Sequence, residues 1–265
     1  SCTCLSLDTC LFKRRRRARG DAQPRAPLEQ VDDNTSTHHR SLVVTTSEHE
    51  WQERHAARNS CHYVRMTHAV VALALPGVVA FDLSTAAQVF GHPEEDEYSF
   101  EVVTTDGRQV PSSTGFQIAG AGDPSSLRQA DTIVIPGYSP HTTPSDDVLE
   151  ALRSAHSRGT RVVSICTGAF ALAPTGLLDG LSATTHWQDA QELRTAYPAV
   201  NVTPDVLYID HGHVASSAGV AAGIDLCLHL VRRDHGAATA NRIARRMVVP
   251  PHRAGGQAQY VAPAA

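Results

Sequence analysis

The chain has 265 residues, and its 42% hydrophobic content is enough to bury one sizeable core or two small ones. Residues 1–65 carry 11 Lys and Arg against 8 Asp and Glu, whereas residues 66–265 carry 12 against 19. Because the longer part is acidic, it lacks the basic footprint that attracts phosphate backbones, which argues against nucleic-acid binding by this part alone.

The first 65 residues have the composition of a disordered tail. They show no sustained hydrophobic period and contain many chain breakers and charges, including the basic run at residues 13–19. The apolar stretch ahead of that run is very short and contains Asp8, which does not fit a secretory signal. Since Met66 stands directly before the first convincing strand, we expect the native chain to start there and residues 1–65 to be upstream sequence or a flexible extension.

Cysteine and histidine spacing predicts neither a disulfide framework nor a metal site. Four of the six cysteines lie in the tail, and only Cys166 and Cys227 lie in the remainder. Without a signal peptide or an apolar run of membrane-spanning length, we expect a cytoplasmic location and no membrane partner. His211 and His213 lack further ligands at zinc spacing, so we expect an exposed turn there, and neither a metal nor a cofactor is predicted.

From residue 66 onward, apolar strands alternate with helical stretches. We predict strands at 68–75, 99–107, 131–137, 161–165 and 182–186, a hairpin within 205–219, and helices at 78–90, 145–159, 169–178, 187–197 and from residue 220. This alternation predicts an α/β fold with a mainly parallel sheet covered by helices on both faces. Ligands collect at the carboxyl ends of such strands, where Gly137, Cys166 and His186 stand.

Cys166 lies where the period changes from strand to helix. Ser164 and Gly168 stand two positions to either side, which is the pattern of a nucleophile elbow. The first N–H groups of the following helix and the positive end of its dipole favour a thiolate. The sequence therefore predicts an activated cysteine that is more reactive than Cys227, with a small, buried and inert cysteine as the alternative.

Three stretches carry a resemblance to a known family. They read "AFDLSTAAQVF", "CTGAFALAPTGLLDGLSATTHW" and "DVLYIDHGHVASSAGVAAGIDLCLHLVRRDHGAATANRIARRMVVPPHRAGGQAQYV". Residues 66–261 resemble the PfpI/ThiJ-like branch of the class I glutamine-amidotransferase superfamily, above all the sensor domain of GlxA-type AraC-family transcriptional regulators. The resemblance implies a flavodoxin-like fold, a homodimer and a small-molecule ligand. Such regulators carry a helix-turn-helix domain after the sensor. We expect that domain to be missing here, residues 262–265 to be a tail, and this chain not to bind DNA specifically.

The resemblance also suggests which residues form the site. Asp82 stands where isonitrile-hydrating relatives have an aspartate that approaches the nucleophile; the alternative is a helix N-terminal Asp that stabilises the dipole. His186 matches a histidine near the elbow that could accept the thiol proton, although its neighbour Trp187 favours a histidine held by packing. Peptidase-like members have a histidine directly after the cysteine. Thr167 occupies that position, which makes a peptidase a weak hypothesis.

Two backbone donors and one aromatic ring complete the expected site. The N–H groups of Thr167 and Gly137 are the predicted oxyanion donors. Tyr138 replaces a second glycine that relatives commonly have, and we expect its ring and phenol to form a wall of a ligand pocket.

Two hypotheses for function remain. One is a ligand-sensing domain that needs no catalysis, and the other is a stand-alone hydratase or hydrolase that uses Cys166. The C-terminal third resembles regulators more than enzymes, so the sequence favours the sensor.

The last predicted helix bears on assembly. We expect Val220, Ile224, Leu228 and Val231 to pack on the sheet and the Arg-rich end of this helix to be exposed.

Overall fold

The computed structural model describes residues 67–92, 96–120, 122 and 124–259. The predictions for residues 1–65 and 262–265 lie outside the described residues. All elements named below belong to the second of two compact units, residues 63–265.

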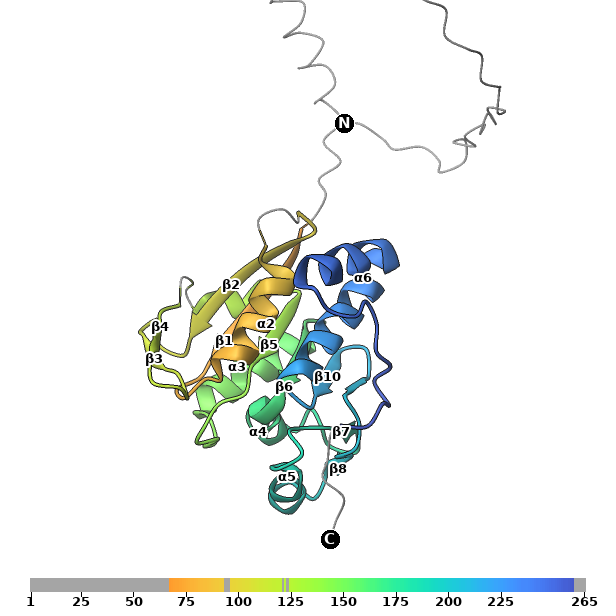
Figure 1. The fold of residues 1–265 in the computed structure, drawn as a ribbon. Coiled ribbons are helices and arrows are strands. Elements are labelled where there is room, and N and C mark those ends of the chain that lie inside the picture. The colour runs from red at the N-terminus through yellow and green to blue at the C-terminus, as the bar shows by residue number, and fades with distance from the viewer. Residues whose placement is uncertain (1–66, 93–95, 121, 123, 260–265) are drawn as a thin grey trace, which may run out of the picture. The chain divides into compact units, whose positions relative to one another are not determined.

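A six-stranded sheet forms the centre of the fold, in the order β2-β1-β5-β6-β10-β9 (Figure 1). The strands are β1 (His68–Ala74), β2 (Tyr98–Thr104), β5 (Thr132–Ile135), β6 (Arg161–Ile165), β9 (Tyr208–Asp210) and β10 (Val214–Ser217). Every neighbouring pair is parallel except β10 and β9, which form the predicted hairpin. The prediction of a mainly parallel sheet is confirmed.

Helices cover both faces of this sheet. They are α2 (Ala80–Phe90), α3 (Asp146–Ser157), α4 (Ala169–Leu172), α5 (Ala190–Ala196) and α6 (Ala221–Met247). Successive strand residues point to opposite faces. Val70 and Val163 therefore join the apolar cluster under α2 and α6, which lie on the near face in Figure 1, whereas Val71 and Val162 join the cluster under α3 and α4. Strands that are buried on both faces must be apolar throughout, as the sequence pattern indicated.

Smaller elements complete the chain. They are the antiparallel pair β3 (Val110–Pro111) and β4 (Gln117–Ile118), the parallel pair β7 (Ser182–Ala183) and β8 (Asn201–Val202), and the 3-10 turns Pro124–Arg128, Cys166–Gly168 and Ala173–Thr175. The single helix predicted for residues 169–178 was wrong, because α4 gives way to a 3-10 turn at Ala173. Pro174 stands there and has no N–H to continue an α-helix.

The last helix also differs from its prediction. Val220 precedes α6 with a φ of 46° and a side chain that is 44% exposed, so it does not pack on the sheet. Leu228 and Val231 are buried as expected. α6 is kinked at Gly236, whose φ is 84°. At its far end Arg242 and Arg245 are exposed, as predicted.

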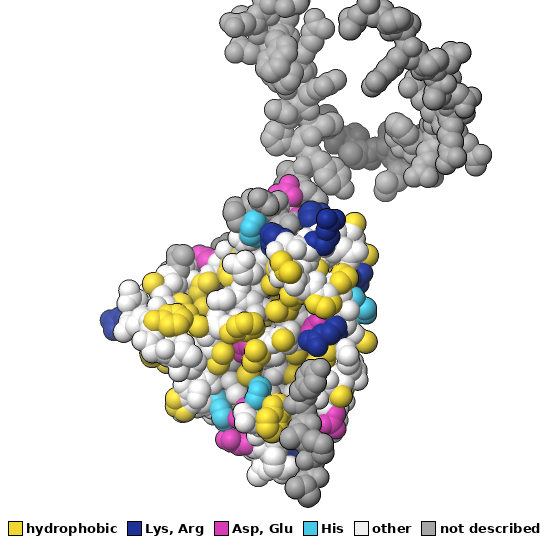
Figure 2. Space-filling view, viewed as in Figure 1, with side chains coloured by type: hydrophobic (Ala, Val, Ile, Leu, Met, Phe, Trp, Pro, Cys, Tyr) yellow, Lys and Arg dark blue, Asp and Glu magenta, His cyan; other side chains and the backbone are white. Residues whose placement is uncertain are grey.

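The surface carries a mixture of apolar and basic side chains (Figure 2). Apolar side chains gather over the face formed by α2, and dark blue basic side chains gather near the end of α6. Phe81 on α2 is 51% exposed. Among the described residues, no helix combines the length and the apolar character that crossing a bilayer requires.

Candidate functional site

Cys166 occupies a sharp turn directly after β6. Its φ is 57°, in the left-handed region that a residue with a side chain rarely adopts, and its side chain is 6% exposed. The hydroxyl of Thr185 donates a hydrogen bond of 2.8 Å to the Cys166 carbonyl oxygen. This backbone geometry is that of a nucleophile elbow, which confirms the predicted turn.

Two glycines allow neighbouring loops to approach the cysteine closely. A Cβ atom on Gly219 would lie 2.3 Å from the Cβ and 2.7 Å from the Sγ of Cys166. One on Gly137 would lie 2.6 Å from an Asp82 carboxylate oxygen and 3.0 Å from the Cys166 Cβ. The ends of β5 and β10 are thus pressed against the elbow. The sequence analysis missed Gly219; its position directly after a predicted strand was the available signal.

Asp82 comes from the first turn of α2 and is fully buried beside Cys166. Its Oδ1 accepts a hydrogen bond of 2.9 Å from the Val220 N–H, and its Oδ2 accepts one of 3.2 Å from the Gly137 N–H. Burial raises the pKa of the Asp82 carboxyl, and these two backbone bonds oppose that rise. The carboxyl thus ties two loops together at the elbow, a role that goes beyond stabilising the dipole of its own helix.

Burial and a neighbouring carboxylate disfavour the ionised form of the Cys166 thiol. Burial and then the charge of Asp82 raise the pKa of Cys166 to about 12, although the Thr167 N–H hydrogen bond to the sulfur lowers it. Both effects oppose the thiolate that the start of the following helix was predicted to favour. α4 has only four residues and so a weak dipole, whereas burial and a carboxylate both act on the thiol.

One of the two predicted oxyanion donors already has a partner. The Gly137 N–H donates a hydrogen bond of 3.2 Å to Asp82. The Tyr138 N–H donates to the Thr167 hydroxyl at 2.9 Å, and that hydroxyl donates back to the Tyr138 carbonyl oxygen. An oxyanion hole needs donors that are free to meet developing charge. In this structure the Gly137 N–H instead holds the Asp82 carboxylate.

Tyr138 is not among the residues that line the cavity next to Cys166. Its side chain is 2% exposed and belongs to the apolar cluster under α3 and α4. Its hydroxyl donates a hydrogen bond of 2.8 Å to the Thr142 carbonyl oxygen. Tyr138 lines a separate cavity of about 220 Å³ together with Leu75 and Thr142, so its role in a ligand pocket stays a prediction.

His186 stands at the wall of a cavity next to the elbow. Its side chain is partly exposed, its Nδ1 lies 3.6 Å from an Asp189 carboxylate oxygen, and its ring lies 5.8 Å from that of Trp187. Within the described residues, its ring nitrogens make no hydrogen bond to Cys166. His186 is near enough for its charge to affect Asp82, but the structure does not place it as a base in contact with the thiol.

The cavity beside the elbow has a volume of about 260 Å³. Its lining includes the apolar side chains of Leu207, Ala218 and Ala222 and the rings of His186 and Trp187. Gly219, which also lines it, lies against Cys166.

Residues 250–259, which we call the strap, also line this cavity through Arg253 and Gln259. Arg253 donates two hydrogen bonds to the carboxylate of Asp225 on α6. The Gln259 amide donates to the carbonyl oxygens of Pro204 and Val206 at 2.6 and 3.0 Å. The strap is thus held against the sheet and closes one side of the cavity.

The protonated thiol leads to a prediction about labelling. We expect iodoacetamide to modify Cys166 slowly at pH 8, and we expect Asp82→Asn to raise the rate roughly tenfold, because the variant lacks the charge that disfavours the thiolate. Peptide-resolved mass spectrometry separates Cys166 from the other cysteines. Cys227, which is fully buried, is the internal control for opening of the fold. An unchanged ratio of Cys166 to Cys227 labelling in the variant would contradict this account.

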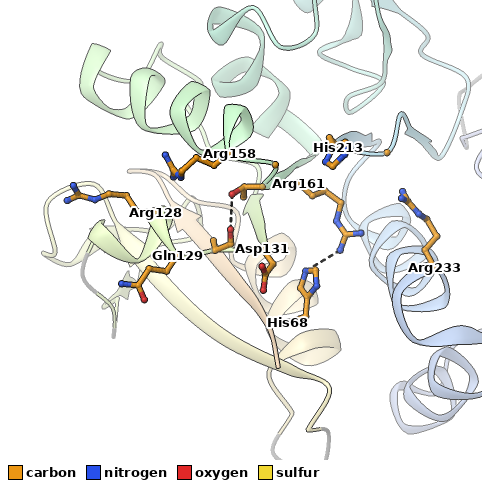
Figure 3. Close-up of a pocket in the computed structure, with 12 residues that line it drawn as sticks. His68, Arg128, Gln129, Asp131, Arg158, Arg161, His213 and Arg233 are labelled. Carbon is orange, nitrogen blue, oxygen red and sulfur yellow. Dashed lines mark hydrogen bonds between the residues drawn. The ribbon is translucent and has the colours of Figure 1, made fainter. Parts of the chain in front are cut away.

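A second cavity, of about 480 Å³, lies at the opposite edge of the sheet, where the strands begin (Figure 3). Arg161, at the start of β6, donates hydrogen bonds of 2.9 and 2.6 Å to both carboxylate oxygens of Asp234 on α6. Arg233 on α6 forms an ion pair with one carboxylate oxygen of Asp210 on β9. The paired arginines therefore fasten α6 to the sheet.

Comparison with known proteins identifies the family of this chain and several relatives. Residues 68–233 match the DJ-1/PfpI family. The HTH-type transcriptional regulator CdhR of Pseudomonas aeruginosa is 32% identical over 181 residues, which are 67% of this chain and 54% of CdhR. This chain thus spans about half the length of that regulator. Isonitrile hydratase of Pseudomonas putida is 31% identical over 144 residues, 54% of this chain and 62% of the hydratase.

A solved structure has the same fold. The AraC family transcriptional regulator from Pseudomonas putida superposes with a TM-score of 0.62 and 21% identity, over 68% of this chain and 99% of that chain. At this identity the likeness concerns the flavodoxin-like α/β fold alone.

Proposed function

The chain belongs to the DJ-1/PfpI family, and we propose that it is the ligand-sensing, amidotransferase-like domain of an AraC-family transcriptional regulator of the GlxA type. The observation that carries the proposal is the state of Cys166. Burial and the neighbouring, fully buried Asp82 carboxylate raise the pKa of its thiol to about 12, and the Gly137 N–H, one of the two expected oxyanion donors, is already bonded to Asp82. Acyl transfer needs an activated nucleophile and free donors, whereas recognition of a ligand needs neither.

The cavity beside the elbow is the proposed ligand site. Its volume of about 260 Å³ suits a small molecule. An apolar part of such a ligand would pack between Leu207 and Trp187, and a polar part would face His186. Cys166 and Asp82 then serve to fix the backbone of Gly219 and Val220 at the cavity wall.

The strap supports a route from the ligand to the rest of a regulator. It lines the cavity through Arg253 and Gln259 and is the last part of the chain that the structure describes. A ligand that displaces or tightens these residues would move the segment that leads to a DNA-binding domain in such regulators. The proposal also includes a cytoplasmic homodimer, for which the apolar side chains over α2 offer a surface, and no specific DNA binding by this domain alone.

Thermal unfolding in the presence of small ligands tests the sensor function. With a panel of amino acids, small amines and small carboxylic acids, we expect at least one compound to raise the Tm of the wild-type chain, because binding to the folded state alone stabilises it. Trp187→Ala should remove the shift, and Phe116→Ala, at another exposed aromatic, should retain it. A compound that stabilises both variants equally would place its site outside the cavity.

The Asp82–Cys166 pair favours one second candidate, a cysteine-dependent isonitrile hydratase. Such an enzyme adds one water to an alkyl isonitrile and yields the N-alkylformamide. Incubation with an alkyl isonitrile and analysis by mass spectrometry distinguishes the two functions. If the N-alkylformamide appears with the wild-type chain and not with Cys166→Ala, the result supports the hydratase function and contradicts the sensor function.

A further inference from the structure

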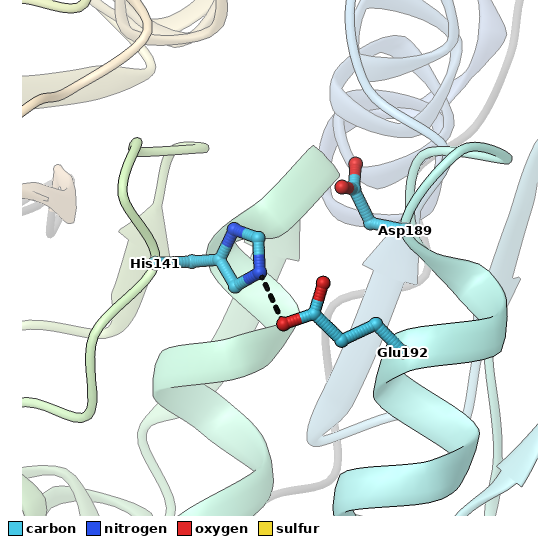
Figure 4. A group of neighbouring side chains, drawn as sticks. All are labelled: His141, Asp189 and Glu192. Atoms are coloured by element: carbon cyan, nitrogen blue, oxygen red, sulfur yellow. Dashed lines mark hydrogen bonds and ion pairs between the residues drawn. The ribbon is translucent and has the colours of Figure 1, made fainter.

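We propose that His141, Asp189 and Glu192 form a binding site for one divalent cation of the zinc type (Figure 4). His141 belongs to the loop after β5, Asp189 directly precedes α5, and Glu192 lies in the first turn of that helix. The sequence analysis expected no metal, because it considered only ligands that are close along the chain. The fold brings His141 to residues that follow it by about fifty positions.

The distances between the ligand atoms suit a small cation. One nitrogen or carboxylate oxygen from each of the three side chains lies within 4.8 Å of the others. His141 Nε2 and Glu192 Oε1 are 3.1 Å apart. Around a tetrahedral zinc with bonds of about 2.0 Å, neighbouring ligand atoms are about 3.3 Å apart. The His141–Glu192 pair therefore already spans one edge of such a site, and an Asp189 oxygen within 4.8 Å of both is the candidate third ligand.

The surrounding structure orients these ligands. The His141 ring lies on the Phe170 ring, with centroids 4.0 Å apart and planes inclined by 34°. Asp189 and Glu192 are three positions apart at the start of α5, so both can reach the same side of the helix. The Glu192 side chain is 63% exposed, which gives a cation access from solvent. In Figure 4 the imidazole and the Glu192 carboxylate face each other, and the Asp189 carboxylate lies above them in this view, directed away from the pair.

The chemistry of the donors selects the class of cation. Two carboxylates beside one imidazole place a charge of −2 around a nitrogen ligand, which a divalent cation neutralises. Magnesium and calcium prefer oxygen ligands alone, whereas an imidazole with carboxylates suits zinc and its neighbours in the first transition row. Three protein ligands leave a fourth position open to water or to a ligand.

The site is connected to the elbow cavity through Asp189. His186 lines the cavity, and its Nδ1 lies 3.6 Å from Asp189 Oδ2. A histidine in this place can orient a ligating carboxylate from outside the coordination sphere. A bound cation would thus fix the position of the His186 wall, whatever the function of that cavity is.

Zinc content measured on the full chain tests the proposal. After equilibrium dialysis against Zn²⁺ and removal of free metal, we expect wild-type protein to retain one equivalent more than Glu192→Gln or His141→Gln. Glu150→Gln is the matched control, since Glu150 is an exposed helical glutamate paired with Arg153. It should retain as much zinc as the wild type. The test uses the difference in zinc content between the wild type and each variant. It does not use the total zinc content, because residues 1–65 contain further cysteines and histidines.

Cobalt provides a second readout. Tetrahedral Co²⁺ absorbs in the visible range, and we expect these bands to weaken by at least half in both site variants and to persist in Glu150→Gln. Circular dichroism of each variant shows whether it is folded. Equal zinc content and equal cobalt spectra in the wild type and in the two folded site variants would overturn the proposal, as would a wild-type chain that retains no zinc.

Discussion

Gly219→Ala is expected to lower the free energy of unfolding by about 3 kcal/mol or more and to disrupt the elbow. Gly219 has a φ of 90°, where an alanine is strained. Its new Cβ would also lie 2.3 Å from the Cβ of Cys166 and 2.8 Å from its Cα. Neither atom can move without shifting β6, whose last residues are completely buried. Urea unfolding followed by circular dichroism measures the loss.

Gly212→Ala is the matched control for this variant. Gly212 has a φ of 91°, but a Cβ there would meet no atom within 4 Å. Its substitution therefore reports backbone strain alone, for which we expect about 1 kcal/mol. The excess loss in Gly219→Ala measures the clash with Cys166. Equal losses in the two variants would show that the contact between Gly219 and the elbow is unimportant.

Asp234→Asn is expected to cost about 3 to 5 kcal/mol, because it leaves the guanidinium of Arg161 buried without its charge partner. The Arg161 side chain is only 7% exposed, and both of its hydrogen-bonded carboxylate oxygens belong to Asp234. The Tyr98 hydroxyl also donates to Asp234, at 2.9 Å. Asp205→Asn, at an exposed carboxylate, is the control and should change stability by less than about 0.5 kcal/mol.

The same pair predicts a dependence of stability on pH. Burial alone would raise the pKa of Asp234, but the hydrogen bonds and charge of Arg161 outweigh it and hold that pKa below its usual value. A lowered folded-state pKa gives stability that is present above the unfolded pKa, about 3.9, and is lost as pH falls through the folded pKa. Wild-type stability should therefore fall more steeply below pH 4 than that of Asp234→Asn. Parallel curves for the two proteins would contradict this assignment.

The fold was predictable because its signals are local. A buried parallel strand is apolar at every position, and a helix on its face has an apolar stripe, so the alternation of the two along the chain determines the class of fold. The turn at Cys166 is local in the same sense, since small residues flank it at fixed distances. The boundaries were less certain: Pro174 shortened one predicted helix, and the backbone of Val220 delayed the start of another. The homodimer stays a prediction.

What the sequence by itself determined was therefore the fold and the elbow, whereas the proximity of Asp82 to Cys166 was only suggested by the family resemblance, beside the alternative of an Asp that stabilises its own helix dipole. The tertiary structure decided the protonation of that thiol, because a pKa depends on burial and on charges brought from other elements. It also decided which backbone N–H groups are free, since the partner of the Gly137 N–H is 55 positions away in the chain. The group formed by His141, Asp189 and Glu192 exists for the same physical reason: the loop after β5 and the start of α5 meet only when the chain is folded.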